Sequence, residues 1–302
     1  MDKEYMQKLT KMISSIPQSV TKEIEKEIEG YLDKCGLFYK CFLRIKKGDS
    51  ICKKLELKIA EKGEEYKIQD LIGARIVVYF KEDIALCEKI VSQHFTILDV
   101  SKNAEDIENF GPQRINYVCR LPEYMIEQLE DELWKYPIDK SFEIQIRTIF
   151  SEGWHEIEHD FRYKCKDEWV NNRDLSRTLN GIFATLDNCD WAIDRLLTQV
   201  AYRHYKNGEW VPMLKNVLRI RLADCKDMHE ILDYFDNNRQ LAKQYFRFDR
   251  EEFLISLSDL KAKVPLTMKN VILMINIQQI HNDSLYELTS DALINLMAQQ
   301  RE

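Results

Sequence analysis

The apolar run at residues 72–80 (IGARIVVYF) constrains the fold more than any other segment of this sequence. A near-continuous apolar run of this length is typical of a strand that is buried on both faces of a sheet. Helical periodicity follows at residues 83–93, and shorter strand patterns occur at residues 38–45, 95–100, 114–121 and 141–147. Strands interspersed with helices predict an α/β or α+β sheet domain.

The remaining segments carry mainly helical patterns. Over residues 2–34 we expect two amphipathic helices that separate at Pro17, the second one capped by Thr21. Further helices are predicted at residues 50–61, 150–164 and 175–204, until Asn207, Gly208 and Pro212 interrupt the pattern. We therefore expect one domain at residues 1–205 and a helical C-terminal extension at residues 206–302, with helices near residues 227–237, 249–261 and 284–299.

The charge and the cysteines limit where such a chain works and what it binds. The formal net charge of −7 argues against attraction of the whole surface to nucleic acid or to an anionic membrane, so any anion site is local. The chain has no apolar run of the ~18 residues that cross a bilayer, and its start lacks the pattern of a secretion signal. The eight cysteines are scattered without a Cys-x-x-Cys pair, which favours reduced thiols and a cytoplasmic protein without membrane contact.

One segment is locally basic. Residues 38–62 carry eight lysines and arginines against Asp49, Glu56 and Glu61. A solvated helix face is one interpretation, and a local site for a polyanion is the other.

The strand pattern at residues 142–148 (FEIQIRT) places three polar side chains on one face. Glu143, Gln145 and Arg147 alternate with apolar residues, so they follow one another about 7 Å apart. A carboxylate, an amide and a guanidinium in a row can hold an acceptor and withdraw its proton. An exposed edge strand with a simple cross-strand ion pair would show the same pattern.

Asp70 comes just before the buried strand that carries Arg75. A single carboxylate beside phosphate-binding bases suits Mg²⁺, which keeps several waters and needs only one or two carboxylates plus the phosphates. An aspartate that caps a short helix ahead of the strand is the other interpretation.

The segment from His155 to His159 (HEIEH) matches H-E-x-x-H, a pattern that on a helix can bind zinc with Glu156 as the base. A third zinc ligand at the spacing of the known proteases does not follow. We therefore favour a packed, hydrogen-bonded helix face.

Four short motifs, taken together, point to one family. They are Arg44-x-Lys46 with Ser50 and Lys54; Asp70-x-x-Gly73-x-Arg75; Glu143-x-Gln145-Ile146-Arg147-Thr148; and Trp154 with Glu158-His159 and Tyr163-Lys164. In this order and spacing they closely resemble the synthetase domain of the RelA/SpoT alarmone enzymes, over roughly residues 20 to 200. The resemblance implies an α+β fold, with a mixed-sheet nucleotidyltransferase-like domain flanked by helices and followed by the C-terminal helical extension.

The resemblance also implies a reaction and a role for each residue. A pyrophosphokinase of this family transfers the β,γ-pyrophosphate of ATP to the 3′-hydroxyl of GDP or GTP with Mg²⁺, giving ppGpp or pppGpp and AMP. Glu143 would be the base, and Asp70, together with Glu143, would bind the metal. The ATP phosphates would be held by Arg44, Lys46, Ser50, Lys54 and Arg75. The acceptor would be held by Gln145, Arg147, His159 and Asn116.

The sequence departs from the family at the acceptor loop, which normally reads Gly-Tyr-x-Ser-x-His. Here residues 111–116 place Pro112, Arg114 and Asn116 at the Tyr, Ser and His positions, in a predicted surface loop at residues 103–113. Phe110 or Tyr117 could supply a substitute ring. Two alternatives therefore stay open: a toxic relative, with an antitoxin partner, that modifies an adenosine nucleotide or the 3′ end of tRNA, and a degenerate protein that only binds nucleotides. A homo-oligomer is also compatible with the sequence.

Overall fold

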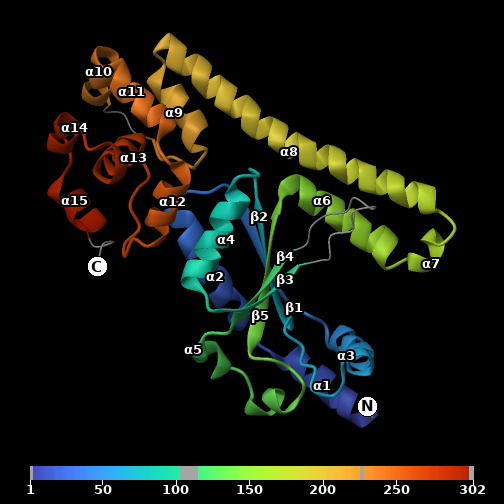
Figure 1. Cartoon of the computed structure of the whole chain (residues 1–302). Coiled ribbons are helices and arrows are strands. Elements are labelled where there is room, and N and C mark those ends of the chain that lie inside the picture. The colour runs from blue at the N-terminus through green and yellow to red at the C-terminus, as the bar shows by residue number, and fades with distance from the viewer. Residues whose placement is uncertain (1–2, 103–114, 225–227, 299–302) are drawn as a thin grey trace. The chain divides into compact units, whose positions relative to one another are not determined.

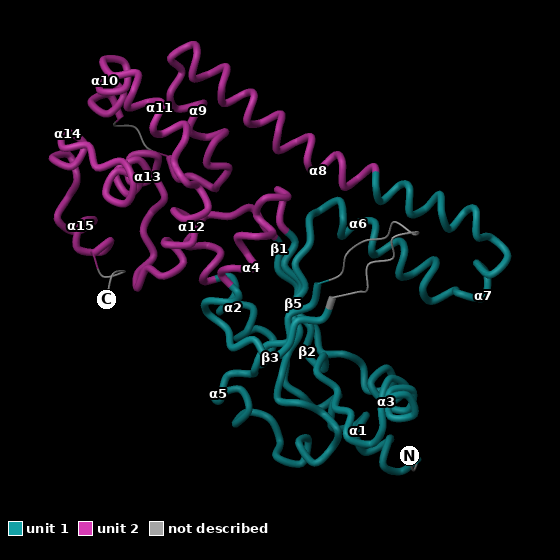
Figure 2. Tube along the Cα trace, viewed as in Figure 1, with its two compact units in different colours: residues 1–29, 40–77, 91–184 teal, residues 30–39, 78–90, 185–302 magenta. Residues whose placement is uncertain are grey.

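The computed structural model describes residues 3–102, 115–224 and 228–298. The chain forms two compact units (Figure 2). Unit 1 comprises residues 1–29, 40–77 and 91–184, and unit 2 comprises residues 30–39, 78–90 and 185–302. Among the helices that the structure describes, none has both the length and the apolar character needed to cross a membrane.

Unit 1 is built around a five-stranded sheet in the order β1-β2-β5-β4-β3 (Figure 1). The strands are β1 (Tyr39–Ile45), β2 (Ile72–Val78), β3 (Ile97–Lys102), β4 (Ile115–Arg120) and β5 (Ser141–Thr148). β4 runs antiparallel to both β3 and β5. Just ahead of β2 and β5, Ile68 and Ile138 pair in parallel, so these two strands start in the same direction. The sheet is therefore mixed, which confirms the predicted fold class.

β5 alternates as the sequence predicted, and β2 is the largely buried strand that the sequence predicted. In β5, Phe142 and Ile144 are fully buried, whereas Glu143 and Gln145 on the other face are partly exposed. β2 is buried along most of its length and leaves Arg75 partly exposed. The apolar residues on one face anchor the sheet, so the polar residues of the other face are held in fixed positions.

The helices of unit 1 surround this sheet. They are α1 (Lys3–Ser15), most of α2 (Gln18–Lys34), α3 (Gly48–Lys62), α5 (Glu123–Ile126), α6 (Ile149–Glu158), α7 (Lys166–Trp169) and the first part of α8 (Arg173–Asn207), with a 3₁₀ turn at Asp131–Lys135 and a π-helical turn at His159–Tyr163. Thr148 caps α6 by accepting a hydrogen bond from the backbone N of Ser151 at 3.1 Å. The indole of Trp154 donates to the carbonyl of Leu179 at 2.9 Å and thereby fixes α6 against α8.

Two details of the predicted helices were wrong. The helices do separate at Pro17, but α2 begins at Gln18, so Thr21 lies inside the helix and donates its hydroxyl to the carbonyl of Gln18 at 2.9 Å. The predicted interruption at Pro212 lies inside α9 (Trp210–Leu218), because proline is tolerated in the first turn of a helix. Gly208 does end α8, with a positive φ of 76°.

Unit 2 is mainly helical. Besides the first residues of α4 (Asp83–His94), the end of α8 and α9, it contains α10 (His229–Asn237), α11 (Arg239–Arg247), α12 (Arg250–Ser258), α13 (Met268–Ile275), α14 (Asp283–Glu287) and α15 (Asp291–Ala298), with a π-helical turn at Asn276–Ile280. Its core includes Phe235 and Tyr245, whose ring centroids lie 5.0 Å apart. The boundary at residue 205 stays a prediction, and the loop predicted at residues 103–113 lies outside the described residues.

Unit 2 also buries several charges. Asp83 is fully buried and accepts a hydrogen bond at 2.7 Å from Arg250, which also lies 3.0 Å from Glu82. Arg219 forms a further ion pair with Glu82. The start of α4 is therefore held by side chains from later segments of unit 2.

Candidate active site

A hollow of about 620 Å³ opens on unit 1. Ten of the eleven site residues predicted from the sequence line it. They are Arg44, Lys46, Lys54, Asp70, Arg75, Asn116, Glu143, Gln145, Arg147 and His159. Ser50 is not among the lining residues; it lies exposed in the first turn of α3.

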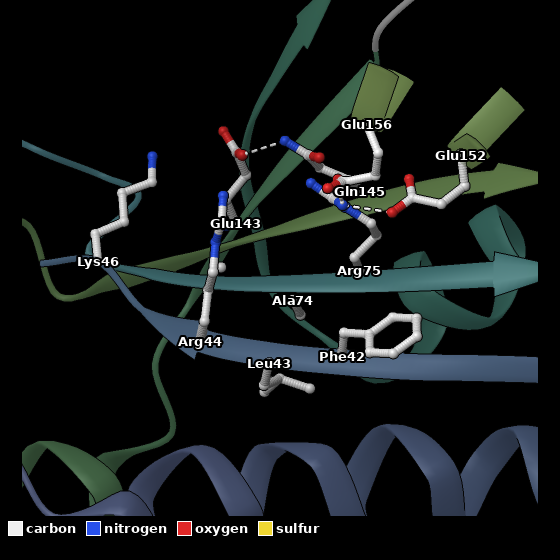
Figure 3. Close-up of a pocket in the computed structure, with 11 residues that line it drawn as sticks. Phe42, Leu43, Arg44, Lys46, Ala74, Arg75, Glu143, Gln145, Glu152 and Glu156 are labelled. Atoms are coloured by element: carbon white, nitrogen blue, oxygen red, sulfur yellow. Dashed lines mark hydrogen bonds and ion pairs between the residues drawn. The ribbon is translucent and has the colours of Figure 1, made fainter. Parts of the chain in front are cut away.

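The sheet order explains why residues distant in sequence meet. Arg44 lies on β1, Arg75 on β2 and Glu143 on β5, and these three strands are neighbours in the sheet. Their side chains, and that of Lys46 just after β1, rise on the same side of the strands (Figure 3). Asn116 on β4 pairs directly with Gln145 on β5 and extends this polar face by one strand.

Asp70 and Glu158 are the two buried acids among the residues that line the hollow. The Oδ2 of Asp70 accepts hydrogen bonds from the ammonium groups of Lys46 and Lys54, the latter at 2.6 Å. Burial alone would raise the pKa of Asp70, but the two lysines outweigh it and hold the pKa below the ordinary value. Asp70 is therefore ionised at neutral pH. Its Oδ1 is buried and has no hydrogen-bond partner among the described residues.

The polar face of β5 forms a continuous chain of hydrogen bonds. The amide of Gln145 donates to Glu143 at 2.7 Å, and the guanidinium of Arg147 donates to the amide oxygen of Gln145 at 3.0 Å. Arg147 donates in addition to Glu152 of α6 at 2.9 Å. These bonds fix the orientation of the Glu143 carboxylate.

Arg75 lies between two carboxylates of α6. It pairs with Glu152 and, at 2.5 Å, with Glu156, which is four residues further along the same helix face (Figure 3). Burial would lower the pKa of Arg75, but the two carboxylates raise it above the ordinary value. In this structure Arg75 is therefore a charged group that is already paired.

The lining of the hollow is close to electrical balance. Seven lysines and arginines face six aspartates and glutamates among its lining residues. The basic segment at residues 38–62 does supply four of the cations, Arg44, Lys46, Lys54 and Lys62. A polyanion that enters must therefore replace carboxylates as the partners of these cations.

A smaller pocket of about 400 Å³ shares part of this lining. Phe42, Leu43 and Ala74 give it an apolar part beside Arg44 and Arg75 (Figure 3). Phe42 is 52% exposed, so its ring is available for stacking. Apolar surface beside guanidinium groups can hold the planar base of a nucleotide while the phosphates of that nucleotide reach the cations.

The two histidines of the H-E-x-x-H segment differ in burial. His155 is buried in α6, where its ring lies 5.4 Å from that of Trp154. His159 opens the π-helical turn, stacks on Tyr163 at 5.7 Å and lies 3.0 Å from a carboxylate oxygen of Asp160. Both histidines line the large hollow.

The sequence analysis missed three residues of this region. Glu152 was not singled out, Glu156 was considered only as a zinc-site base, and Phe42 was considered only as part of a strand. The spacing of Glu152 and Glu156 on one helix face could have indicated a shared cation. Their partner Arg75, however, is 77 and 81 positions away in the sequence, so only the fold identifies it.

Comparison with known proteins shows which family this part of the chain resembles. Residues 43–168 match the family model described as "Region found in RelA / SpoT proteins". Over these residues the chain is therefore similar to RelA and SpoT proteins. All of the residues that line the two hollows, except Phe42, fall inside this region.

One relative of the RelA/SpoT region is the GTP pyrophosphokinase YwaC of Bacillus subtilis. It is 28% identical over 130 residues, which cover 41% of this chain and 58% of the relative. Two structures of the small alarmone synthetase 1 from Bacillus subtilis are also similar at 20% identity. One has a TM-score of 0.46 and covers 65% of this chain and 96% of that chain. The other, bound to its product pppGpp, has a TM-score of 0.48 and covers 66% of this chain and 100% of that chain.

Proposed function

We propose that this chain is a pyrophosphokinase that transfers the β,γ-pyrophosphate of ATP to the 3′-hydroxyl of GDP or GTP and releases AMP. The proposal is supported by the RelA/SpoT region and by the similarity to a protein named GTP pyrophosphokinase. The observation that carries it is the single hollow that is lined by Arg44, Lys46, Lys54, Asp70, Arg75 and Glu143.

On the side of the site that binds ATP, the reaction requires cations more than it requires a covalent intermediate. Attack of the acceptor oxygen on the β-phosphorus breaks the bond to the oxygen that bridges the α- and β-phosphates, and negative charge spreads over the phosphate oxygens. Fixed cations stabilise this charge without reorganising during the reaction. Arg44 projects into the hollow, and Lys46 and Lys54 reach the phosphates once they leave Asp70.

The acceptor side is organised by β5. Glu143 would accept the proton of the 3′-hydroxyl as the new O–P bond forms, a contribution of roughly 10²- to 10⁴-fold for a positioned base. The hydrogen bond from Gln145 to Glu143 holds the carboxylate in place, and Arg147 holds Gln145 in turn. Asn116, paired with Gln145 across the strands, and His159 are proposed to contact the acceptor.

The residues around Asp70 fit a magnesium ion. A hard cation prefers carboxylate oxygens, and the buried Oδ1 of Asp70 has no partner among the described residues while the charge of the group is retained. Asp70 would hold Mg²⁺, with Glu143 as a second ligand. When bound, Mg²⁺ would neutralise part of the phosphate charge.

The proposal is tested by incubating the protein with γ-labelled ATP and Mg²⁺ in the presence of GDP, GTP, ATP or tRNA in separate reactions. We expect the label to appear in a 3′-pyrophosphorylated guanine nucleotide, with one AMP released per transfer. Transfer of the label to an adenosine nucleotide or to tRNA would show that this molecule, and not a guanine nucleotide, is the acceptor. Absence of transfer in all reactions, with ATP still bound, would favour a nucleotide-binding protein without catalysis.

A further inference from the structure

The exposed side of α8 carries a long apolar stripe. Eight side chains recur at alternating spacings of four and three residues, and they are Leu175, Leu179, Ile182, Leu186, Cys189, Ile193, Leu196 and Val200. Spacings of this kind, sustained over more than three heptads, are typical of a coiled-coil seam. From residue 175 to residue 200 the stripe extends for about 37 Å at 1.5 Å per residue.

The stripe does not point into the protein. Leu175, Ile182 and Leu196 are 53%, 50% and 57% exposed, and Cys189 is also exposed. The other four members are partly buried. A different side of α8 is buried against the rest of the protein.

Within unit 1, the buried side of α8 presents Phe183, whose ring lies 5.0 Å from that of Trp154. Within unit 2 it presents Asp194, which accepts a hydrogen bond from the backbone N of Glu82. The helix therefore packs with one side and exposes the apolar stripe along another.

Charge is absent from the stripe and from its outer flank between residues 178 and 200, whereas the buried flank carries Asp190. We call the exposed members of the stripe, Leu175, Ile182, Cys189 and Leu196, the exposed row. Its outer neighbours are Thr178, Thr185, Ala192 and Gln199, so between residues 178 and 200 the stripe and these neighbours hold no ionised side chain. These uncharged neighbours leave no charge to be desolvated when a second helix approaches.

We propose that this stripe binds the same stripe of a second copy of the chain in antiparallel orientation. A two-fold axis requires a surface that is complementary to itself. With the axis between residues 187 and 188, Leu175 faces Val200 of the second copy, and Leu179 faces Leu196. In the same alignment Ile182 faces Ile193, and Leu186 faces Cys189.

The ends of the stripe select the orientation. Arg203 continues the exposed row beyond Leu196, and Asp174 precedes Leu175 at the other end of α8. In the antiparallel pair, Arg203 of one copy lies within about one helical turn of Asp174 of the other, twice by symmetry. In a parallel pair, Arg203 would face Arg203 across the seam, which costs free energy through like-charge repulsion. The charges therefore favour the antiparallel copy.

Sedimentation equilibrium at micromolar concentration tests the proposal. We expect the wild-type chain to have twice the 36.0 kDa mass of a single chain. Leu196→Glu should weaken the association by at least about 100-fold, because it places a carboxylate against apolar surface twice per dimer. Thr198→Glu adds the same charge two positions away, outside the stripe, and should leave the dimer intact. A monomeric wild type, or a dimer that Leu196→Glu leaves unchanged, would overturn the proposal.

Cys189 provides an independent test within the native sequence. Across the antiparallel pair the two Cys189 residues lie near the axis, separated by about 4.5 Å along the helices and by the usual 8–10 Å between helix axes. A short bifunctional maleimide should therefore join two chains, and Cys189→Ser should abolish the product while the dimer persists. In the Cys189→Ser background, Leu196→Cys should not cross-link to itself, because the two positions are about 25 Å apart along the antiparallel pair. Efficient cross-linking there would overturn the antiparallel arrangement.

Discussion

The ammonium of Lys54 lies 2.6 Å from Oδ2 of Asp70, although the two residues are 16 positions apart in the sequence. The same oxygen also accepts a hydrogen bond from Lys46. Two cations thus converge on one carboxylate oxygen and leave the other without a partner among the described residues. Asp70 thus holds in place two of the cations that we propose to bind the triphosphate.

Asp70→Asn should therefore reduce pyrophosphate transfer by at least about 100-fold, because the amide preserves the shape but removes the charge that would bind Mg²⁺. AMP release from ATP measures the loss, and circular dichroism checks that the fold is retained. Glu61→Gln is a matched control, since it removes the exposed partner of Lys58 on α3 at a site outside the hollow. Transfer at the wild-type rate by Asp70→Asn would exclude Asp70 from the reaction.

Glu143→Gln should lower kcat by roughly 10²- to 10⁴-fold, the loss expected for a positioned general base. Glutamine has nearly the same shape, so KM for the acceptor and Tm should change little. Steady-state kinetics with varied acceptor separate the two parameters. A large rise in KM with an unchanged kcat would assign Glu143 to acceptor binding instead.

The sequence predicted the polar face of β5 because period-two alternation depends only on neighbouring residues. It could not identify the pairing of Arg75 with Glu152 and Glu156, since that contact depends on how α6 packs over β2 and not on any local pattern. The near balance of charge in the hollow was missed for the same reason. Four of the seven basic residues lie within residues 38–62, whereas the acids that match them come from several distant segments.

The helices of unit 2 show a similar limit. α13 was not predicted because six of its eight residues are buried, so its sequence has no polar face to reveal a helical period. α9 was missed because Pro212 was interpreted as a break. The π-helical turn at residues 159–163 leaves no recognisable local pattern in the sequence.

Glu156→Gln should strengthen the binding of ATP by about two- to fivefold, because a mostly exposed ion pair is worth about 0.5–1 kcal/mol. The substitution releases Arg75 from one of its two carboxylates, so a phosphate competes with only Glu152. Titration calorimetry with a non-hydrolysable ATP analogue measures the change. Weaker binding would show that Glu156 supports the nucleotide site and does not compete with it.

Arg250→Met should reduce the free energy of unfolding by about 3–5 kcal/mol, since it leaves the fully buried Asp83 without its closest cation. Urea unfolding followed by circular dichroism gives the value. Lys263→Met removes an exposed ion pair with Asp33 in the same unit and should cost no more than about 1 kcal/mol. Equal losses in the two variants would contradict the proposed importance of the buried pair.

Asp83 and Asp70 should make opposite contributions to the pH dependence of stability. Burial raises the pKa of Asp83 above its ordinary value, although Arg250 acts in the other direction. The folded chain therefore keeps a proton there at a pH at which the unfolded chain has lost it. The retained proton stabilises the folded chain. This stabilisation is fully present below about pH 3.9, the pKa of the unfolded chain, and it is lost as pH rises through the pKa of the folded chain.

The stability of Asp83→Asn relative to wild type should thus increase as pH rises from about 4 and become constant above the folded pKa of Asp83. For Asp70 the pKa is lowered, so its contribution is present above about pH 3.9 and is lost as pH falls through the folded value. The stability of Asp70→Asn relative to wild type should therefore increase as pH falls. Urea midpoints of the three proteins between pH 3 and pH 7 give both slopes, and slopes of the same sign would contradict the assignment.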